Sequence, residues 1–157
     1  MITIRRLRTG EVDLYKQLRL RALHDAPYAF PATYEAALQR SAESWREQAE
    51  GTARGSDRAT FIAFADDLPI GMAALYRRAG QVDEGELLQV WVSPDYRGTR
   101  LASDLMDACF RWAEENNFRT VIAGITKGNA RALKFYIHYG FSMLEETSTG
   151  VYLVKAV

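Results

Sequence analysis

The most informative segment of the chain reads Val92-Ser-Pro-Asp-Tyr-Arg-Gly-Thr-Arg-Leu-Ala102. The apolar residues of Glu86 to Val92 predict a strand before it, and an amphipathic helix is expected to open near Leu101. The first turn of a helix leaves backbone N–H groups without intrahelical partners, and the helix dipole is positive there. A phosphate fits such a place, and Arg97 adds a planar fork of donors. The segment therefore predicts a phosphate or pyrophosphate cradle, although taken alone the same residues also fit a plain surface loop.

A second informative segment reads Asn129-Ala-Arg-Ala-Leu-Lys-Phe-Tyr136-Ile-His-Tyr-Gly140-Phe141. It follows an apolar run, Val121 to Ile125, which is typical of a buried central strand. Asn129 is a candidate N-cap for a short helix, and Gly140 sits where helices often end in a left-handed residue. In the simplest interpretation, Tyr136 is a core residue of this helix with a satisfied hydroxyl.

Composition excludes several classes of function. The chain has 157 residues, 48% of them hydrophobic and 25% charged, as in an ordinary globular protein. The formal net charge of +0 gives no global basic field for nucleic acid or an anionic membrane. One cysteine, Cys109, excludes an internal disulfide, and its helical setting favours a core position. No apolar run approaches a membrane span and the first residues resemble a strand, so a cytoplasmic location is expected.

Periodicity and breaker residues give a coarse order of elements. Ile2 to Leu7 alternates as a strand, and Val12 to Leu23 is helical, with Thr9 as a candidate cap. Helical signal returns from Thr33 and again after Ser41, a candidate N-cap for Glu43 to Glu50. The remaining expected elements are a loop over 51–57, a hairpin of 60–65 and 70–77, a strand over 86–92, a helix from 101 to about 116, a strand over 120–125, a helix over 130–138, and a last hairpin of 141–146 and 151–154.

The two segments together resemble the motifs of one family. Arg97 to Ala102 is similar to the Gln/Arg-x-x-Gly-x-Gly/Ala acyl-CoA signature of the GNAT superfamily of N-acetyltransferases. Asn129 to Phe141 resembles that family's second motif, an Asn followed two helical turns later by Tyr and then by Gly-Phe. Their order and separation also match. The chain departs from the pattern at Arg100, where the family usually has Gly, a residue that permits close backbone approach.

The resemblance implies a fold and a cofactor. The expected fold is α/β, with a mixed central sheet of about six to seven strands, flanking helices and one N-acetyltransferase domain over residues 1–157. The strands ending near Val92 and Ile125 are expected to splay apart and form an acyl-CoA cleft for acetyl-CoA. By resemblance, the cofactor-binding residues are Val90, Trp91 and Val92 for the pantetheine arm, Arg97, Gly98, Thr99, Arg100, Leu101 and Ala102 for the pyrophosphate, and Asn129 further up.

Catalytic roles also follow from the resemblance. Tyr136 is the expected general acid, because a phenol within reach can protonate a departing CoA thiolate. Glu86 is the expected base or substrate contact, and Asp83 and Glu84 remain open as bases acting through water. His24 and His138 lack metal-ligand spacing, so neither is expected to bind a metal, and no metal site is predicted.

The acceptor is expected to be a small-molecule amine or a peptide amine, bound where the N-terminal helices meet. Tyr28, Phe30 and Tyr34 lie in that region, where their rings either hold a cation or pack a helix junction. The expected partners include no nucleic acid and no membrane, and the chain is expected to be a monomer or a homodimer. Two other classes remain open. One is a catalytically silent acyl-CoA sensor with a cradle compromised at Arg100. The other is a nucleotide-binding domain, which the lack of Gly-x-x-x-x-Gly-Lys-Ser/Thr and Gly-x-Gly-x-x-Gly opposes.

Overall fold

A computed structural model describes residues 1–157 and places seven strands in one mixed sheet, in the order β1-β2-β3-β4-β5-β7-β6. The strands are β1 (Ile2–Arg6), β2 (Arg58–Ala65), β3 (Leu68–Arg77), β4 (Glu84–Val92), β5 (Thr120–Thr126), β6 (Ser142–Glu146) and β7 (Gly150–Ala156). The helices are α1 (Val12–Asp25), α2 (Tyr34–Leu38), α3 (Ala42–Ala53), α4 (Leu101–Glu115) and α5 (Ala130–Tyr139), with 3₁₀ turns η1 (Pro27–Ala29) and η2 (Pro94–Tyr96). The predicted α/β fold with a mixed sheet is confirmed.

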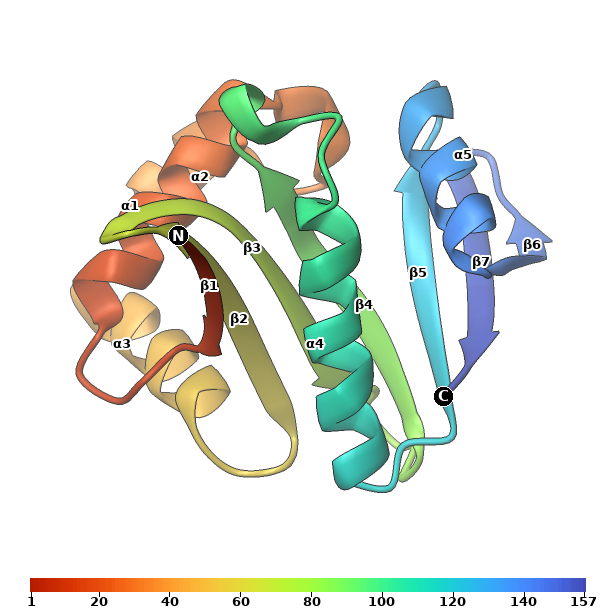
Figure 1. Cartoon of the computed structure of the whole chain (residues 1–157), viewed down its shortest axis with the longest axis horizontal. Helices are drawn as coiled ribbons and strands as arrows, with labels where there is room; N and C mark the ends of the chain where they lie inside the picture. The colour runs from red at the N-terminus through yellow and green to blue at the C-terminus, as the bar shows by residue number, and fades with distance from the viewer.

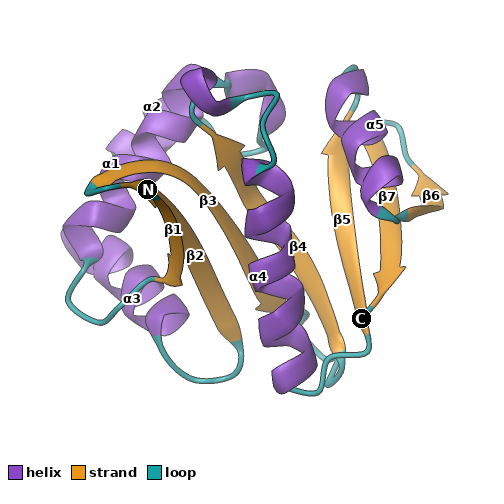
Figure 2. Cartoon of the chain, viewed as in Figure 1, coloured by secondary structure: helices purple, strands orange, loops and turns teal.

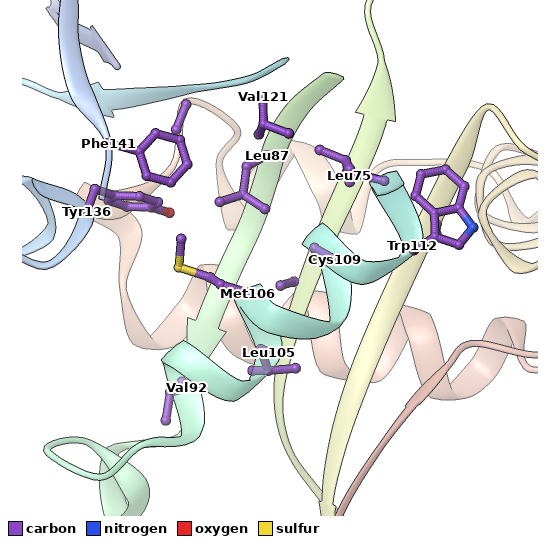
Figure 3. Packing of buried hydrophobic residues seen from close by; sticks show 14 of the residues in the cluster. Leu75, Leu87, Val92, Leu105, Met106, Cys109, Trp112, Val121, Tyr136 and Phe141 are labelled. Atoms are coloured by element: carbon purple, nitrogen blue, oxygen red, sulfur yellow. The ribbon is translucent and has the colours of Figure 1, made fainter. Parts of the chain in front are cut away.

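Helices cover both faces of the sheet and make two cores (Figure 1, Figure 2). The helices α1 and α3 pack on one face around Tyr15 and Trp45, while α4 and α5 pack on the other. The apolar stripe of α4 is buried as its spacing predicts, at Leu101, Leu105, Ala108, Cys109 and Trp112. Figure 3 shows Leu105, Cys109 and Trp112 of this stripe in the same cluster as Leu75 and Leu87 of the sheet and Tyr136 of α5.

The sheet opens between β4 and β5. These strands are parallel and pair only over Glu84–Leu87 and Thr120–Ala123. Beyond Leu87 they diverge, which leaves the β5-facing edge of β4 without a strand partner (Figure 1). The predicted splay near Val92 and Ile125 is confirmed, and it is the feature that makes room for a site within the sheet.

A β-bulge bends β4 at the opening. Met72 of β3 pairs with Trp91 and Ala74 pairs with Leu88, so β4 has one residue more than β3 between these pairs. Gln89 in the bulge has a φ of 57°, unusual for a residue other than glycine. The Tyr15 hydroxyl donates a hydrogen bond of 3.0 Å to the Gln89 side-chain oxygen. This hydrogen bond ties the bulge to α1, which packs on the face of the sheet opposite to α4.

Helix ends agree with the sequence in some places and differ in others. Ser41 and Thr33 cap α3 and α2, accepting hydrogen bonds from the backbone of Ser44 and Ala36, each at 3.1 Å. The predicted cap at Thr9 is wrong.

Glu11 occupies the N-cap position of α1, and its carboxylate accepts from the backbone of Arg8 instead. Arg5 also pairs with that carboxylate, at 2.8 Å. The predicted loop at 51–57 starts later, because the buried Thr52 hydroxyl bonds Thr60 and keeps α3 helical to Ala53. None of the helices combines the length and apolar composition needed to cross a membrane.

Candidate active site

A cleft of about 870 Å³ lies where β4 and β5 part. The starts of α4 and α5, the η1 segment and the loop before β7 complete its walls. Most of the residues selected from the sequence line it: Tyr28, Phe30, Glu86, Val90, Trp91, Val92, Arg97, Gly98, Thr99, Ala102, Asn129 and Tyr136. The side chains of Tyr34, Arg100 and Leu101 are not part of its lining.

The loop before α4 presents free backbone donors to this cleft. The amides of Gly98, Thr99 and Arg100 make no hydrogen bond within the chain, and the amide of Ala102 lies in the unpaired first turn of α4. Gly98 has a φ of 82°, which explains glycine at that position. The Thr99 hydroxyl accepts from the Leu101 amide at 3.2 Å and closes the turn. Unpaired donors at a helix start fit a phosphate group.

Arg97 divides its guanidinium between the loop and α1. Its Nε donates to the Val92 carbonyl at 3.1 Å, and its Nη2 pairs with the Asp25 carboxylate. Asp25 also accepts from the Trp91 indole at 2.9 Å. Burial acts to raise the pKa of Asp25, but the hydrogen bonds from Trp91 and Arg97 outweigh it and lower the pKa. Arg97 therefore fastens the loop before α4 to the end of α1 as well as lining the cleft.

Arg100 turns its side chain away from the cleft. It is exposed, and its Nη2 lies 3.6 Å from Asp104 one helical turn on. Its backbone, at φ −78° and ψ 0°, occupies the N-cap position of α4 and keeps its amide free. Leu101 is buried in the α4 core, so it also contributes backbone alone.

Tyr136 places a phenol at the inner wall of the cleft. Its ring packs edge-on against Phe141, with centroids 5.4 Å apart, and faces Leu87 and Met106 (Figure 3). The hydroxyl has no hydrogen-bond partner within the chain, contrary to the structural interpretation of a satisfied core residue. Burial raises the pKa of Tyr136, so the phenol keeps its proton at neutral pH.

Of the three acidic residues considered as bases, only Glu86 lines the cleft. Its carboxylate makes no ion pair within the chain. Glu84 pairs with Arg78 at 2.8 Å, and Asp83 lies 4.0 Å from Arg119. The structure therefore separates Glu86, unpaired and facing the cleft, from two neighbours that are engaged elsewhere.

The η1 segment closes the end of the cleft expected to take the acceptor. The Thr126 hydroxyl of β5 donates to the Tyr28 carbonyl at 3.0 Å, which ties η1 across the opening of the sheet. Phe30 lines the cleft and packs against the Arg19 guanidinium. Tyr34 instead packs against His24, with ring centroids 4.9 Å apart, which is the packing role considered for it.

Sequence reasoning missed several residues of the site. Asp25, Gln89 and Thr126 each connect segments more than 60 residues apart. Gln89 carries the one local signal, a polar side chain inside an apolar strand. Asn129 was found by its capping pattern, and its side chain does accept from the Ala132 amide at 3.2 Å.

The fold and the cleft together define a class, the α/β proteins that hold an acyl-CoA between two diverging strands. The chain belongs to the acetyltransferase (GNAT) family, whose model matches residues 19–141. No curated protein sequence matches the chain.

Solved structures share the whole fold at low identity. The PaiA N-acetyltransferase of Thermoplasma acidophilum, in complex with coenzyme A, is 20% identical, with a TM-score of 0.79 over 100% of this chain and 99% of that one. The GNAT domain of S. lividans PAT is 18% identical, with a TM-score of 0.81 over 98% and 89%. AAC(6')-Iy, in complex with the bisubstrate analogue CoA-S-monomethyl-acetylneamine, is 21% identical, with a TM-score of 0.74 over 94% and 95%.

Proposed function

We propose that residues 1–157 form one domain that transfers an acetyl group from acetyl-CoA to the primary amine of a small molecule or peptide. The observation that carries this proposal is that one cleft is lined by both an unpaired carboxylate, Glu86, and a protonated phenol, Tyr136. These are the two groups that direct acyl transfer from a thioester to an amine needs.

The cleft offers suitable groups to two parts of acetyl-CoA, the pyrophosphate and the pantetheine arm. The free amides of Gly98, Thr99, Arg100 and Ala102 suit a pyrophosphate, and the unpaired edge of β4 beyond Leu87 suits the amide groups of a pantetheine arm. Coenzyme A is present in the PaiA structure, and AAC(6')-Iy is bound to a CoA-containing analogue. When bound, acetyl-CoA supplies an acyl group activated as a thioester.

Each residue has a defined task in the proposed reaction. Glu86 accepts the proton that an ammonium substrate must lose before its nitrogen attacks the acyl carbon. Backbone N–H groups of β4 stabilise the negative charge that develops on the acyl oxygen. As the C–N bond forms and the C–S bond breaks, Tyr136 gives its proton to the departing thiolate. The nitrogen then passes its surplus proton to the Tyr136 phenolate, and Glu86 releases the proton it took from the ammonium to solvent.

Thermal unfolding with acetyl-CoA, CoA, ATP and NAD tests the cofactor. A ligand that binds only the native state stabilises it by about 2–3 kcal/mol at a hundredfold excess over its dissociation constant. We expect stabilisation by acetyl-CoA and CoA. If ATP or NAD stabilises the protein and acetyl-CoA does not, the proposal is refuted.

A panel of amines, read by release of the free CoA thiol, then tests the transfer itself. We expect at least one amine to raise thiol release well above the rate without acceptor. Binding of acetyl-CoA without release by any amine would favour the acyl-CoA sensor instead.

A further inference from the structure

Arg19 on α1 is a buried cation without a hydrogen-bond partner or a counterion. Only 8% of the residue is exposed, and its guanidinium lies 4.8 Å from the centre of the Phe30 ring. None of its guanidinium nitrogens donates a hydrogen bond within the chain, and Nη1 is fully buried. Arginines in protein interiors are normally paired, because an unpaired buried charge is costly.

The surroundings of Arg19 offer no negative charge. The ionisable groups nearest to it are the phenols of Tyr15 and Tyr76 and the guanidinium of Arg40. Arg40 does not relieve Arg19, since it is itself a cation that bonds Ser44 and stacks on the Trp45 ring at 4.0 Å. Desolvation lowers the pKa of Arg19, as expected for a charge buried without a counterion.

A second buried donor without an acceptor lies in the same cluster, which is formed by Tyr15, Arg19, Trp45 and Tyr76. The Trp45 indole nitrogen is buried without a partner, and the Trp45 ring packs against Tyr15 at 5.9 Å between centroids. Tyr15 lies one helical turn before Arg19. The chain has two buried side-chain polar atoms without partners, and both of them are donors. Both therefore lack an acceptor, and the guanidinium lacks an acceptor with a negative charge.

The cluster adjoins the acceptor end of the cleft. Phe30, which contacts Arg19, and Gln89, which accepts from Tyr15, both line the cleft. Tyr76 pairs across the sheet with Glu86, the proposed base. Arg19 therefore lies behind the part of the cleft wall that Phe30 and Gln89 form, beside the position of an acceptor whose amine is near Glu86.

We propose that Arg19 binds an oxyanion, a carboxylate or a phosphate, on the same acceptor molecule that carries the amine, with the oxyanion entering between Phe30 and Gln89. A guanidinium matches both anions because its fork donates two parallel hydrogen bonds. The inference rests on the proposed acetyl transfer and narrows its acceptor to amines of the amino-acid or aminoalkyl-phosphate kind. Arg19 is then the residue that selects an acceptor with an anionic group over one that lacks it.

Binding of matched probes tests this without any turnover. Thermal shifts are measured for wild type, Arg19→Gln and Arg19→Lys with L-α-amino acids, the corresponding amino-acid amides and 2-aminoethylphosphonate. We expect wild type to be stabilised by a carboxylate or phosphonate probe and not by the amides. Whichever of the two anionic probes stabilises the protein identifies the oxyanion that Arg19 binds. The shift disappears in Arg19→Gln and is partly kept in Arg19→Lys, which retains the charge.

Two further readouts separate recognition from structure. The melting temperature of Arg19→Gln should stay within ~3 °C of wild type or rise, because the substitution removes an uncompensated charge. With an anionic acceptor, the KM of that acceptor should rise ~10- to 100-fold while the KM of acetyl-CoA stays within ~2-fold.

Equal responses to amino acids and their amides, or a shift that persists in Arg19→Gln, would overturn the inference. So would a loss of more than ~10 °C in both variants, which would assign Arg19 to the core. Failure of the proposed function is a separate result, since it is the absence of any wild-type shift with acetyl-CoA in the same experiment.

Discussion

At the scale of single residues, the chemistry of the site depends on polar atoms that the fold leaves unpaired. The Tyr136 hydroxyl and the Glu86 carboxylate have no partners within the chain, whereas the neighbouring Tyr139 hydroxyl donates to Asp107 at 2.6 Å. Both groups line the cleft, so a molecule bound there can pair with them.

Tyr136→Phe should therefore separate chemistry from packing. The substitution removes a hydroxyl that bonds nothing and keeps the ring against Phe141, so the melting temperature should barely move. Turnover should fall ~10²-fold or more, as is usual when a general acid is lost, and the KM of acetyl-CoA should stay within a few-fold. Steady-state kinetics with an acceptor from the amine panel measure both quantities.

Tyr139→Phe is the matched control on the same helix. It also removes one phenolic oxygen, but Tyr139 is not part of the cleft lining and its hydroxyl does hold a partner. We expect this variant to lose some stability and keep its turnover. Full activity in Tyr136→Phe would return Tyr136 to a core role, with water as the proton donor.

Local residue patterns were informative where the relevant interaction is itself local. Asn129 caps α5 and Gly140 ends it with a φ of 125°, as their spacing predicts. The pairing of Arg97 with Asp25 spans 72 residues and has no counterpart in the local sequence. The partner of a charged side chain depends on which elements the sheet brings together, so such pairs are found only once the topology is known.

At the scale of elements, the backbone at the start of α4 sets how closely a ligand can approach the free amides there. Arg100 is the N-cap residue of this helix and makes no side-chain cap. Glycine is tolerated at an N-cap far better than in a helix interior, so the interior cost of glycine does not apply here. The exposed Arg100–Asp104 pair contributes little, as surface ion pairs usually do.

Arg100→Gly should keep or modestly improve the affinity for acetyl-CoA, because it restores the family's residue without removing the free amide. We expect a dissociation constant within ~3-fold of wild type and an unfolding free energy within ~0.5 kcal/mol. Titration calorimetry and urea unfolding measure the two.

Arg100→Ala is the companion variant, since it removes the charge and keeps a Cβ. A large loss of affinity in both variants would mean that Arg100 turns inward and binds a phosphate. Improved affinity in the glycine variant alone would show that the Cβ limits the approach of the phosphate to the backbone.

At the scale of the whole molecule, the general architecture can be predicted from periodicity and from two motifs. The contacts between α1 and the segments that line the cleft cannot be predicted in this way. The α4 stripe and the apolar β5 run are patterns of the kind that specify a sheet with a helix on its face. The α1 contributions to the site are different: Tyr15 reaches Gln89, and Asp25 reaches Trp91 and Arg97. Tyr15 is buried at helical spacing from Leu18 and Ala22, so the spacing indicates its face of α1. Nothing in that spacing indicates that Tyr15 contacts Gln89 or that Asp25 contacts Trp91 and Arg97.

Asp25 is the residue through which this long-range connection depends on pH. Its pKa is lowered in the folded protein, because the hydrogen bonds from Trp91 and Arg97 outweigh the opposing effect of burial. A carboxyl with a lowered folded pKa stabilises the fold above its unfolded pKa of about 3.9, and that stabilisation is lost as the pH falls through the folded value. The charge of Asp25 should therefore stabilise the fold fully near neutral pH, begin to lose its effect near pH 4, and contribute nothing once the pH lies below the lowered folded pKa.

Asp25→Asn should lower the unfolding free energy by ~1–3 kcal/mol at pH 7, since the amide still accepts from Trp91 but no longer neutralises Arg97. The difference between wild type and variant should shrink as the pH is lowered from 5 towards 3, which urea unfolding at successive pH values measures. Asp57→Asn is the control, because it removes the same charge from an exposed partner of Arg77 and should cost little at any pH. A difference for Asp25→Asn that stays constant down to pH 3 would mean that α1 is held to the loop before α4 by packing and not by this carboxylate.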